Sequence, residues 1–234
     1  FVAHNSADCW AHQDQFDLDE AGNPSSVAGV PPDYFSADGQ LWGNPLYDYQ
    51  AMAADNYQWW TDRFRRMMDL VDEVRVDHFR GFAAYWAVPA GSETAKSGAW
   101  KDGPGLDLFR AVYQKIGRIR LVAEDLGVIT DDVCTLKDAL HLPGMKVIQF
   151  HLKDRADGRL AFDTEPDCIA YTGTHDNNTI RGWYEDDLTP SQQLHVRQML
   201  GLSDEAAPQE IVGALIAYTY RRRAETVIIP MQDL

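Results

Sequence analysis

Apolar residues along the chain fall into short runs separated by longer stretches with helical periodicity. The short runs predict strands at 1–3, 71–76, 119–123, 145–150, 168–172 and 226–230. Steps of three and four residues predict helices at 48–70, 106–116, 130–140, 190–200 and 209–223. Strands that alternate with helices imply parallel strands joined by crossovers. The pattern predicts a (β/α)8 barrel; a doubly wound sheet is less favoured, because no glycine-rich phosphate loop opens any helix.

Ionisable side chains gather where the second predicted strand ends. Arg75, Asp77, His78 and Arg80 follow the apolar positions of this strand within six residues. Such a cluster is costly to bury unless its members pair with one another or with a ligand. Two interpretations therefore stay open here: a structural Asp77–Arg80 ion pair, or the polar rim of a functional site.

Two later strands also end at acidic residues. Glu124 follows the strand at 119–123, and Asp176 follows the strand at 168–172. In a closed barrel these residues and Asp77 could converge on one mouth. Paired carboxylates are what glycoside chemistry requires, one as nucleophile or base and the other as acid. Arg75, on the same strand face as Asp77, could keep that carboxylate ionised, whereas Glu124 has no adjacent cation, so a raised pKa is expected there.

A metal site is the alternative for the same acids. Three strand-end acids, or His175 together with Asp176, could bind magnesium as in enolase-like barrels, although one strand ending on no acid intervenes here. Asp125 and His78 are expected to point away from the site if the strand alternation persists. We interpret Asp125 as structural.

Residues 17–47 are rich in turn signals and yet carry Tyr34, Phe35, Trp42 and Tyr47. We expect a long loop here, and such loops are usually functional or disordered. Flat rings on this loop could stack on sugars, or they could only pin the loop to the barrel.

Composition narrows the class of protein. The 234 residues have a formal charge of −15, which argues against a nucleic-acid surface and favours sugars over bases. No apolar run approaches the roughly 18 residues of a membrane helix. Three cysteines without paired spacing suggest neither a zinc site nor a disulfide framework, so we expect a reducing, cytoplasmic location. We expect one domain over residues 1–234 and no second domain.

Several motifs together resemble one family. The stretches 75–81 (RVDHFRG), 123–127 (AEDLG) and 171–177 (YTGTHDN) resemble, in order, three signature regions of the amylomaltases, or disproportionating enzymes. These are the 4-α-glucanotransferases of glycoside hydrolase family 77. The resemblance extends over nearly the whole chain and includes 29–35 (GVPPDYF), 42–47 (WGNPLY), 142–147 (LPGMKV) and 229–233 (IPMQD).

The resemblance implies a retaining transfer of α-1,4-glucan segments between maltodextrins, derived from starch or glycogen. Asp77 matches the nucleophile that forms a covalent glucosyl-enzyme, Glu124 the general acid/base, and Asp176 the third carboxylate. No metal or organic cofactor is expected, and neither is a nucleic acid or membrane partner. The positions that match sugar-binding residues are Arg75, His175, Tyr34, Gln40, Trp42, Phe150 and Asp154.

The resemblance also implies that the six predicted strands correspond to the third to eighth of the barrel, with the first two missing. We therefore expect a partial barrel whose activity alone is in doubt. The remaining hypotheses are a metal-dependent lyase or isomerase on a (β/α)8 barrel, and an inactive glucan-binding fragment.

Overall fold

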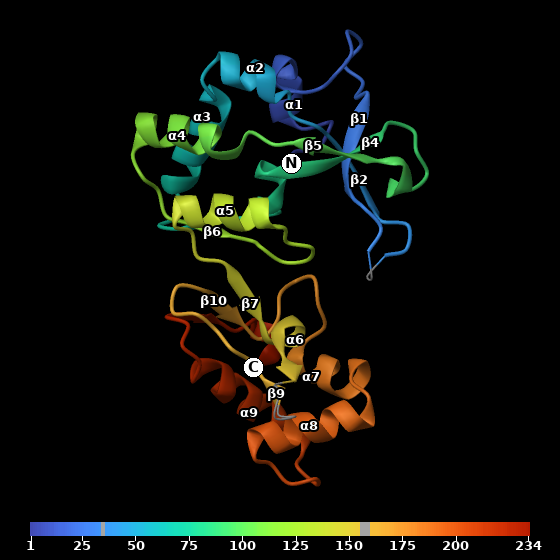
Figure 1. Ribbon diagram of the computed structural model, residues 1–234, viewed down its shortest axis with the longest axis vertical. Helices are drawn as coiled ribbons and strands as arrows, with labels where there is room; N and C mark the ends of the chain where they lie inside the picture. Colours follow the sequence, from blue (N-terminus) through green and yellow to red (C-terminus); the bar gives the residue numbers. More distant parts are fainter. Residues whose placement is uncertain (34–35, 155–159) are drawn as a thin grey trace. The chain divides into compact units, whose positions relative to one another are not determined.

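The computed structural model describes residues 1–33, 36–154 and 160–234, apart from the side chains of 153 and 154. Backbone contacts divide the chain into two compact units, Phe1–Leu142 and Pro143–Leu234 (Figure 1). Each unit combines parallel strands with helices. The expectation of a single domain stays a prediction. Within the described part of the chain, the helices are all too short or too polar to span a bilayer.

The first unit contains a pair of parallel strands, β3 (Val74–Val76) and β6 (Leu121–Ala123), with Val76 opposite Ala123. The residues that follow the two strands, Asp77 and Glu124, therefore leave the same edge of this sheet. The predicted helices at 106–116 and 130–140 are confirmed as α4 (Gly105–Ile116) and α5 (Asp131–Leu140). A short helix, α1 (Ala7–Ala11), lies near the beginning of the chain.

The predicted single helix over 48–70 is wrong, because the chain forms two helices there. These are α2 (Tyr49–Ala54), capped by the Asp48 carboxylate, and α3 (Gln58–Met68). Asn56 and Tyr57 between them adopt left-handed backbone conformations, with φ of 59° and 54°. A residue in the left-handed conformation interrupts the helical hydrogen bonds. The spacing of apolar residues continues through this break, so it does not reveal that the helix is divided.

The expectation of an irregular loop over 17–47 is also wrong. This region contributes β1 (Ser26–Val30) and β2 (Gln40–Pro45) to an antiparallel sheet of order β2-β1-β4-β5. The other strands are β4 (Ala84–Pro89) and β5 (Ala99–Asp102). The alternation of apolar and polar side chains that indicates a strand is interrupted at Gly29, which has no side chain. Glycine is required there because a Cβ would lie 2.5 Å from the Gln40 carbonyl oxygen of the paired strand. In Figure 1 this sheet is drawn to the right of α3 and α4.

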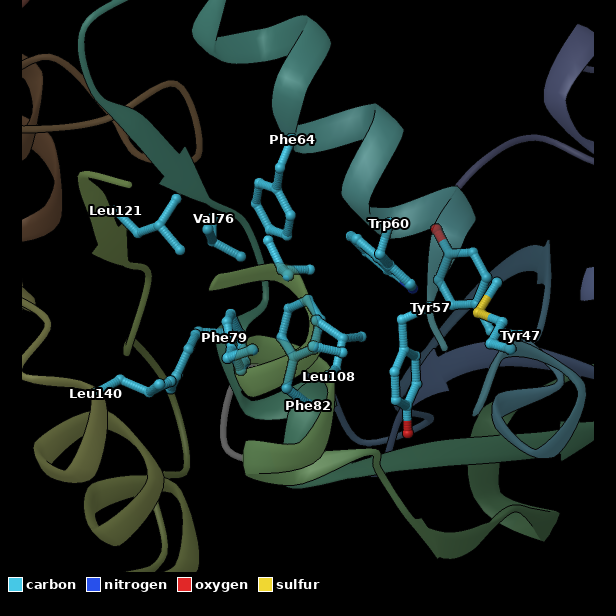
Figure 2. Close-up of a cluster of buried hydrophobic side chains, with 14 of the residues drawn as sticks. Tyr47, Tyr57, Trp60, Phe64, Val76, Phe79, Phe82, Leu108, Leu121 and Leu140 are labelled. Atoms are coloured by element: carbon cyan, nitrogen blue, oxygen red, sulfur yellow. The ribbon is translucent and has the colours of Figure 1, made fainter. Parts of the chain in front are cut away.

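Aromatic and aliphatic side chains from α3, β3, α4, β6 and α5 form the core of the first unit. Figure 2 shows Trp60 and Phe64 of α3 above Phe79, Phe82 and Leu108. Trp60 and Phe82 have ring centroids 5.2 Å apart, and Phe79 and Leu108 are fully buried. Side chains of this core pack against β3 and against the turn that follows Asp77. Packing therefore stabilises the turn in addition to its own hydrogen bonds.

The second unit has a parallel sheet of order β11-β10-β7. Its strands are β7 (Met145–Val147), β10 (Ile169–Tyr171) and β11 (Thr226–Ile228), and a short pair, β8 (Lys153–Asp154) and β9 (Leu160–Ala161), lies apart from them. The strand predicted at 145–150 ends at Val147 and continues as one turn of helix, α6 (Ile148–His151). The strand predicted at 1–3 is absent from the described residues.

Helices of the second unit pack on its sheet around Ile148, Ala170, Ile180 and Leu215. They are α7 (Ile180–Gly182), a π-helical turn (Trp183–Asp187), α8 (Pro190–Leu200) and α9 (Pro208–Tyr220) (Figure 1). The predicted start of α8 is confirmed by a capping box between Thr189 and Gln192, and its predicted end by Gly201 at φ 70°.

Candidate active site

Asp77 forms an ion pair with Arg75 at the end of β3. The Arg75 guanidinium donates to the Asp77 carboxylate at 2.7 Å, and 76% of the Asp77 side chain is exposed. Arg80, the alternative partner, instead donates to the Val128 carbonyl at 2.8 Å and lies 4.0 Å from the Trp100 ring centroid. Arg75, and not Arg80, therefore holds Asp77, whose exposed carboxylate remains available to a ligand.

Glu124 is held by two backbone amides at the end of β6. The amide of His78 donates to Oε2 at 2.8 Å, and the amide of Leu126 donates to Oε1 at 2.9 Å. Burial raises the pKa of Glu124; the two amides and Arg75 oppose this rise, whereas the Asp77 charge adds to it. The raised pKa expected from the sequence is confirmed. An oriented carboxyl group whose pKa is raised is suited to act as a general acid.

The expectation that His78 points away from the site is wrong. His78 adopts a left-handed conformation with φ 47°, so strand alternation stops at Asp77. Its ring packs edge-on against Trp42, with centroids 4.8 Å apart, and burial lowers its pKa to about 4. The neutral imidazole thus joins the end of β3 to β2.

Two of the predicted sugar-binding residues lie on β2 beside this contact. The Trp42 indole donates to the Gln40 side chain at 3.1 Å, and 37% of Trp42 is exposed. Phe1 packs on the same indole with centroids 6.0 Å apart. Tyr34, the third predicted member of this region, lies outside the described residues. Trp42 therefore presents a partly open ring next to the residue that follows Asp77.

An open pocket lies beside the end of β3. Arg75, Asp77 and His78 line it together with apolar side chains such as Trp60 and Phe64. A concave site with an apolar wall and a few polar groups at one edge is typical of small-ligand binding.

Asp125 has the structural role expected of it. Its carboxylate, of which 9% is exposed, accepts a hydrogen bond from Lys137 of α5 at 2.7 Å. This ion pair and the Arg80–Val128 hydrogen bond hold the loop after Glu124 at both ends. The loop supplies the Leu126 amide, so both contacts stabilise the orientation of the Glu124 carboxylate.

The remaining predicted residues belong to the second unit. His175 and Asp176 lie on the loop after β10, both exposed, with Nε2 and Oδ2 3.4 Å apart. Phe150, of which 40% is exposed, lies on α6, and Asp154 lies in β8, with its side chain outside the described part. Convergence of Asp176 with Asp77 and Glu124 stays a prediction.

Two residues that the sequence analysis did not single out hold the loop of Asp176. Gln149 and Asp233 bind both ends of this loop through side-chain hydrogen bonds. Asp233 lies in the stretch 229–233 that resembles the family, whereas Gln149 lies two residues beyond the stretch 142–147, so no sequence signal pointed to it. Among the described residues, no three His, Cys, Asp or Glu side chains are grouped so that they could hold a metal ion.

The sequence of the whole chain is similar to those of one enzyme family. Residues 1–234 match the glycoside hydrolase family 77, described as 4-alpha-glucanotransferase. The chain is 47% identical to the chloroplastic/amyloplastic 4-alpha-glucanotransferase of Arabidopsis thaliana and 42% identical to the 4-alpha-glucanotransferase of Thermus thermophilus. All of this chain is covered in both cases, against 40% and 48% of those relatives, so it spans less than half their length.

Solved structures agree with these sequence matches. The chain superposes on amylomaltase from Streptococcus agalactiae in complex with acarbose with a TM-score of 0.92 and 34% identity, covering 100% of this chain and 47% of that one. Amylomaltase from Corynebacterium glutamicum, at 16% identity and a TM-score of 0.78, shares the fold. The parallel strands of this chain are accordingly part of a (β/α)8 barrel.

Proposed function

The chain belongs to glycoside hydrolase family 77, the 4-alpha-glucanotransferases, and on that premise we propose that the whole protein transfers α-1,4-glucan segments between maltodextrins. Its substrates would be maltooligosaccharides derived from starch or glycogen. The S. agalactiae relative with acarbose bound supports a ligand of this class. No nucleic acid, membrane or cofactor enters the proposal.

The proposed reaction is a double displacement at the anomeric carbon of the donor sugar. Asp77 attacks this carbon while Glu124 gives its proton to the departing glycosidic oxygen. The covalent glucosyl-enzyme then reacts with a glucan hydroxyl, from which Glu124 takes the proton back. Two inversions leave the α configuration unchanged.

One observation carries the proposal: an exposed carboxylate held by an arginine adjoins a half-buried carboxyl group held by two amides. The Arg75 guanidinium, 2.7 Å from the Asp77 carboxylate, holds the orientation that a nucleophile needs. Burial of Glu124, which raises its pKa, favours the protonated form that an acid needs. Two acids with such different surroundings are typical of glycoside-cleaving sites.

Residues of both units supply the remaining proposed contacts. Asp176 would hold sugar hydroxyls and stabilise the distorted ring of the transition state, and His175 would bind the sugar that is cleaved. Phe150 and Asp154 would contact further sugar units. Tyr34, Gln40 and Trp42 would cover the acceptor side and limit access of water, so that a glucan hydroxyl is the preferred acceptor.

A cytoplasmic location is part of the same proposal. It is supported by Cys9, Cys134 and Cys168, which are all free thiols.

Incubation of the whole protein with maltotriose, with and without EDTA, tests the proposed function. Conversion to glucose and longer oligomers that resists the chelator supports glucan transfer, and loss of activity with EDTA supports the lyase or isomerase alternative. Binding without turnover supports a glucan-binding protein. Asp77→Ala should lower the transfer rate at least about a thousandfold, and a near-normal rate in that variant contradicts the assignment.

A further inference from the structure

The loop that carries His175 and Asp176 is fastened at both ends by side chains from the segments that follow the two neighbouring strands. In the sheet order β11-β10-β7, β10 leads into this loop, and its neighbours end near Gln149 and Asp233. We propose that Gln149 and Asp233 form a two-sided clamp that positions Asp176 for the transfer reaction. The expected effect of the clamp on the reaction rate rests on the proposed function, whereas the clamp itself does not.

Gln149 of α6 binds the backbone on both sides of the loop. Its Nε2 donates to the Thr172 carbonyl at 3.0 Å and to the Asn178 carbonyl at 2.9 Å. Its Oε1 accepts from the Asn177 side chain at 3.0 Å. One planar amide therefore joins the residue that precedes the loop to two residues that follow Asp176. Few other groups have donors and an acceptor in this arrangement.

Asp233 binds the two ends of the loop from the other side, in the short helical turn Met231–Asp233 that follows β11. Its Oδ2 accepts from the Thr172 hydroxyl at 2.5 Å, and its Oδ1 accepts from the Ile180 amide at 2.8 Å. The carboxylate is 4% exposed, and Thr172 is fully buried. Hydrogen bonds to a buried charged group are stronger than neutral ones, so this side of the clamp resists opening.

The loop itself is folded tightly between the clamped ends. The Asn177 side chain accepts from the amide of Thr174 at 2.8 Å, and the Thr174 hydroxyl accepts from the Asp176 amide at 3.2 Å. Gly173 allows the close approach to the clamp, because a Cβ there would lie 2.9 Å from Gln149 Nε2. Asn177 is hydrogen-bonded both to Gln149 and to Thr174, which in turn binds the Asp176 amide. A displacement of Gln149 would therefore displace Asp176.

The clamp explains why an exposed acid can have a fixed position. Asp176 has no packed core around it, since most of its side chain is open. A carboxylate that must meet a sugar ring in the transition state loses rate when it is displaced by about 1 Å, of order a hundredfold. We therefore assign Gln149 and Asp233 as positioning residues, which act through Asp176 and need not touch the substrate.

Gln149→Leu tests the clamp, with Gln193→Leu as the matched control. Gln193 of α8 also donates its side-chain amide to backbone carbonyls, at Tyr184 (2.9 Å) and Glu185 (3.3 Å), but it serves the π-helical turn instead of the loop. Both variants lose comparable hydrogen bonds. We expect Gln149→Leu in the whole protein to lower kcat for maltotriose about a hundredfold with little change in KM, and Gln193→Leu to keep kcat.

A double-mutant cycle separates positioning from general destabilisation. If Gln149 acts through Asp176, Gln149→Leu adds no further loss in an Asp176→Ala background. Losses that multiply in the double variant, or a wild-type kcat in Gln149→Leu, overturn the proposal. Asp233→Asn, which keeps one acceptor oxygen, should lower kcat about tenfold, and it tests the other side of the clamp if Gln149→Leu does not fold.

Hydrogen exchange tests the clamp without an activity assay. The amides of Thr174, Asp176 and Ile180 should exchange faster in Gln149→Leu than in the wild type, and at the wild-type rate in Gln193→Leu. Unchanged exchange of these amides refutes the clamp. If the wild type does not convert maltotriose, the proposed function fails, and the exchange rates still decide on the clamp.

Discussion

Replacement of Glu124 by glutamine isolates the proton that the proposed mechanism requires. The substitution keeps the shape of the side chain and removes the ionisable group. General acid catalysis contributes about 10²–10⁴-fold in rate. We therefore expect Glu124→Gln to lower kcat for maltotriose about a thousandfold, whereas Glu73→Gln, an exposed glutamate near β3 paired with Arg120, should leave kcat unchanged.

The structure also sets the cost of this substitution in stability. Glu124 accepts two backbone hydrogen bonds, and a glutamine can accept only one, because its NH₂ group would face the other amide. Losing one hydrogen bond to a charged group costs about 1.5–3 kcal/mol. The glutamine carries no charge that burial disfavours, which offsets part of this cost. The free energy of unfolding should change by less than about 2 kcal/mol at pH 7, and the variant should fold.

The stability difference between the two proteins should depend on pH with a definite sign. Burial raises the pKa of Glu124 above its usual value of 4.5, so the folded wild type holds this proton where the unfolded chain has released it. Stability of the wild type therefore falls as the pH rises from 4.5 toward the folded pKa, relative to Glu124→Gln. Denaturant midpoints of both proteins at several pH values measure this difference.

A donor that needs no acid provides the decisive assay. The fluoride of α-maltosyl fluoride leaves without a proton, so Glu124→Gln should still release a burst of fluoride as the glucosyl-enzyme forms. The later transfer step should remain slow, because it needs a base. A variant with wild-type turnover of maltotriose, or one whose fluoride burst is impaired as much as its maltotriose turnover, would refute the role of Glu124 as the acid.

Three further substitutions test separate parts of the structure. Trp42→Ala should raise the ratio of hydrolysis to transfer, measured as reducing ends against longer oligomers; an unchanged ratio contradicts a covering role. Burial lowers the pKa of His78 to about 4, so the unfolded chain takes up this proton at a higher pH than the folded protein does. The free energy of unfolding of the wild type should therefore decrease by up to about 3 kcal/mol as the pH falls from 6.5 to 4. His78→Asn, which tolerates the left-handed backbone, should remove this loss, and an equal pH dependence in urea unfolding would disprove it. Thr189→Ala should cost about 1 kcal/mol in urea unfolding through loss of the capping box of α8, and no cost would show that the cap does not stabilise the unit.

Local patterns predicted the elements whose hydrogen bonds are made within a few residues. The apolar periodicity of α4, α5 and α8 predicted correct helices, because this signal and the hydrogen bonds it reflects lie within a turn or two. The same patterns placed Asp77 and Glu124 at strand ends, but they left open whether Arg75 or Arg80 pairs with Asp77.

The sequence by itself thus determined the strand-and-helix alternation and the acids at the strand ends. Only the tertiary structure decided that 26–30 pairs with β4, that His78 turns back toward Trp42, and that Gln149 and Asp233 fasten the loop of Asp176. The reason is physical: each of these contacts joins residues dozens of positions apart. Their stability comes from packing and hydrogen bonds between elements, which leave no period in the local order of apolar and polar residues.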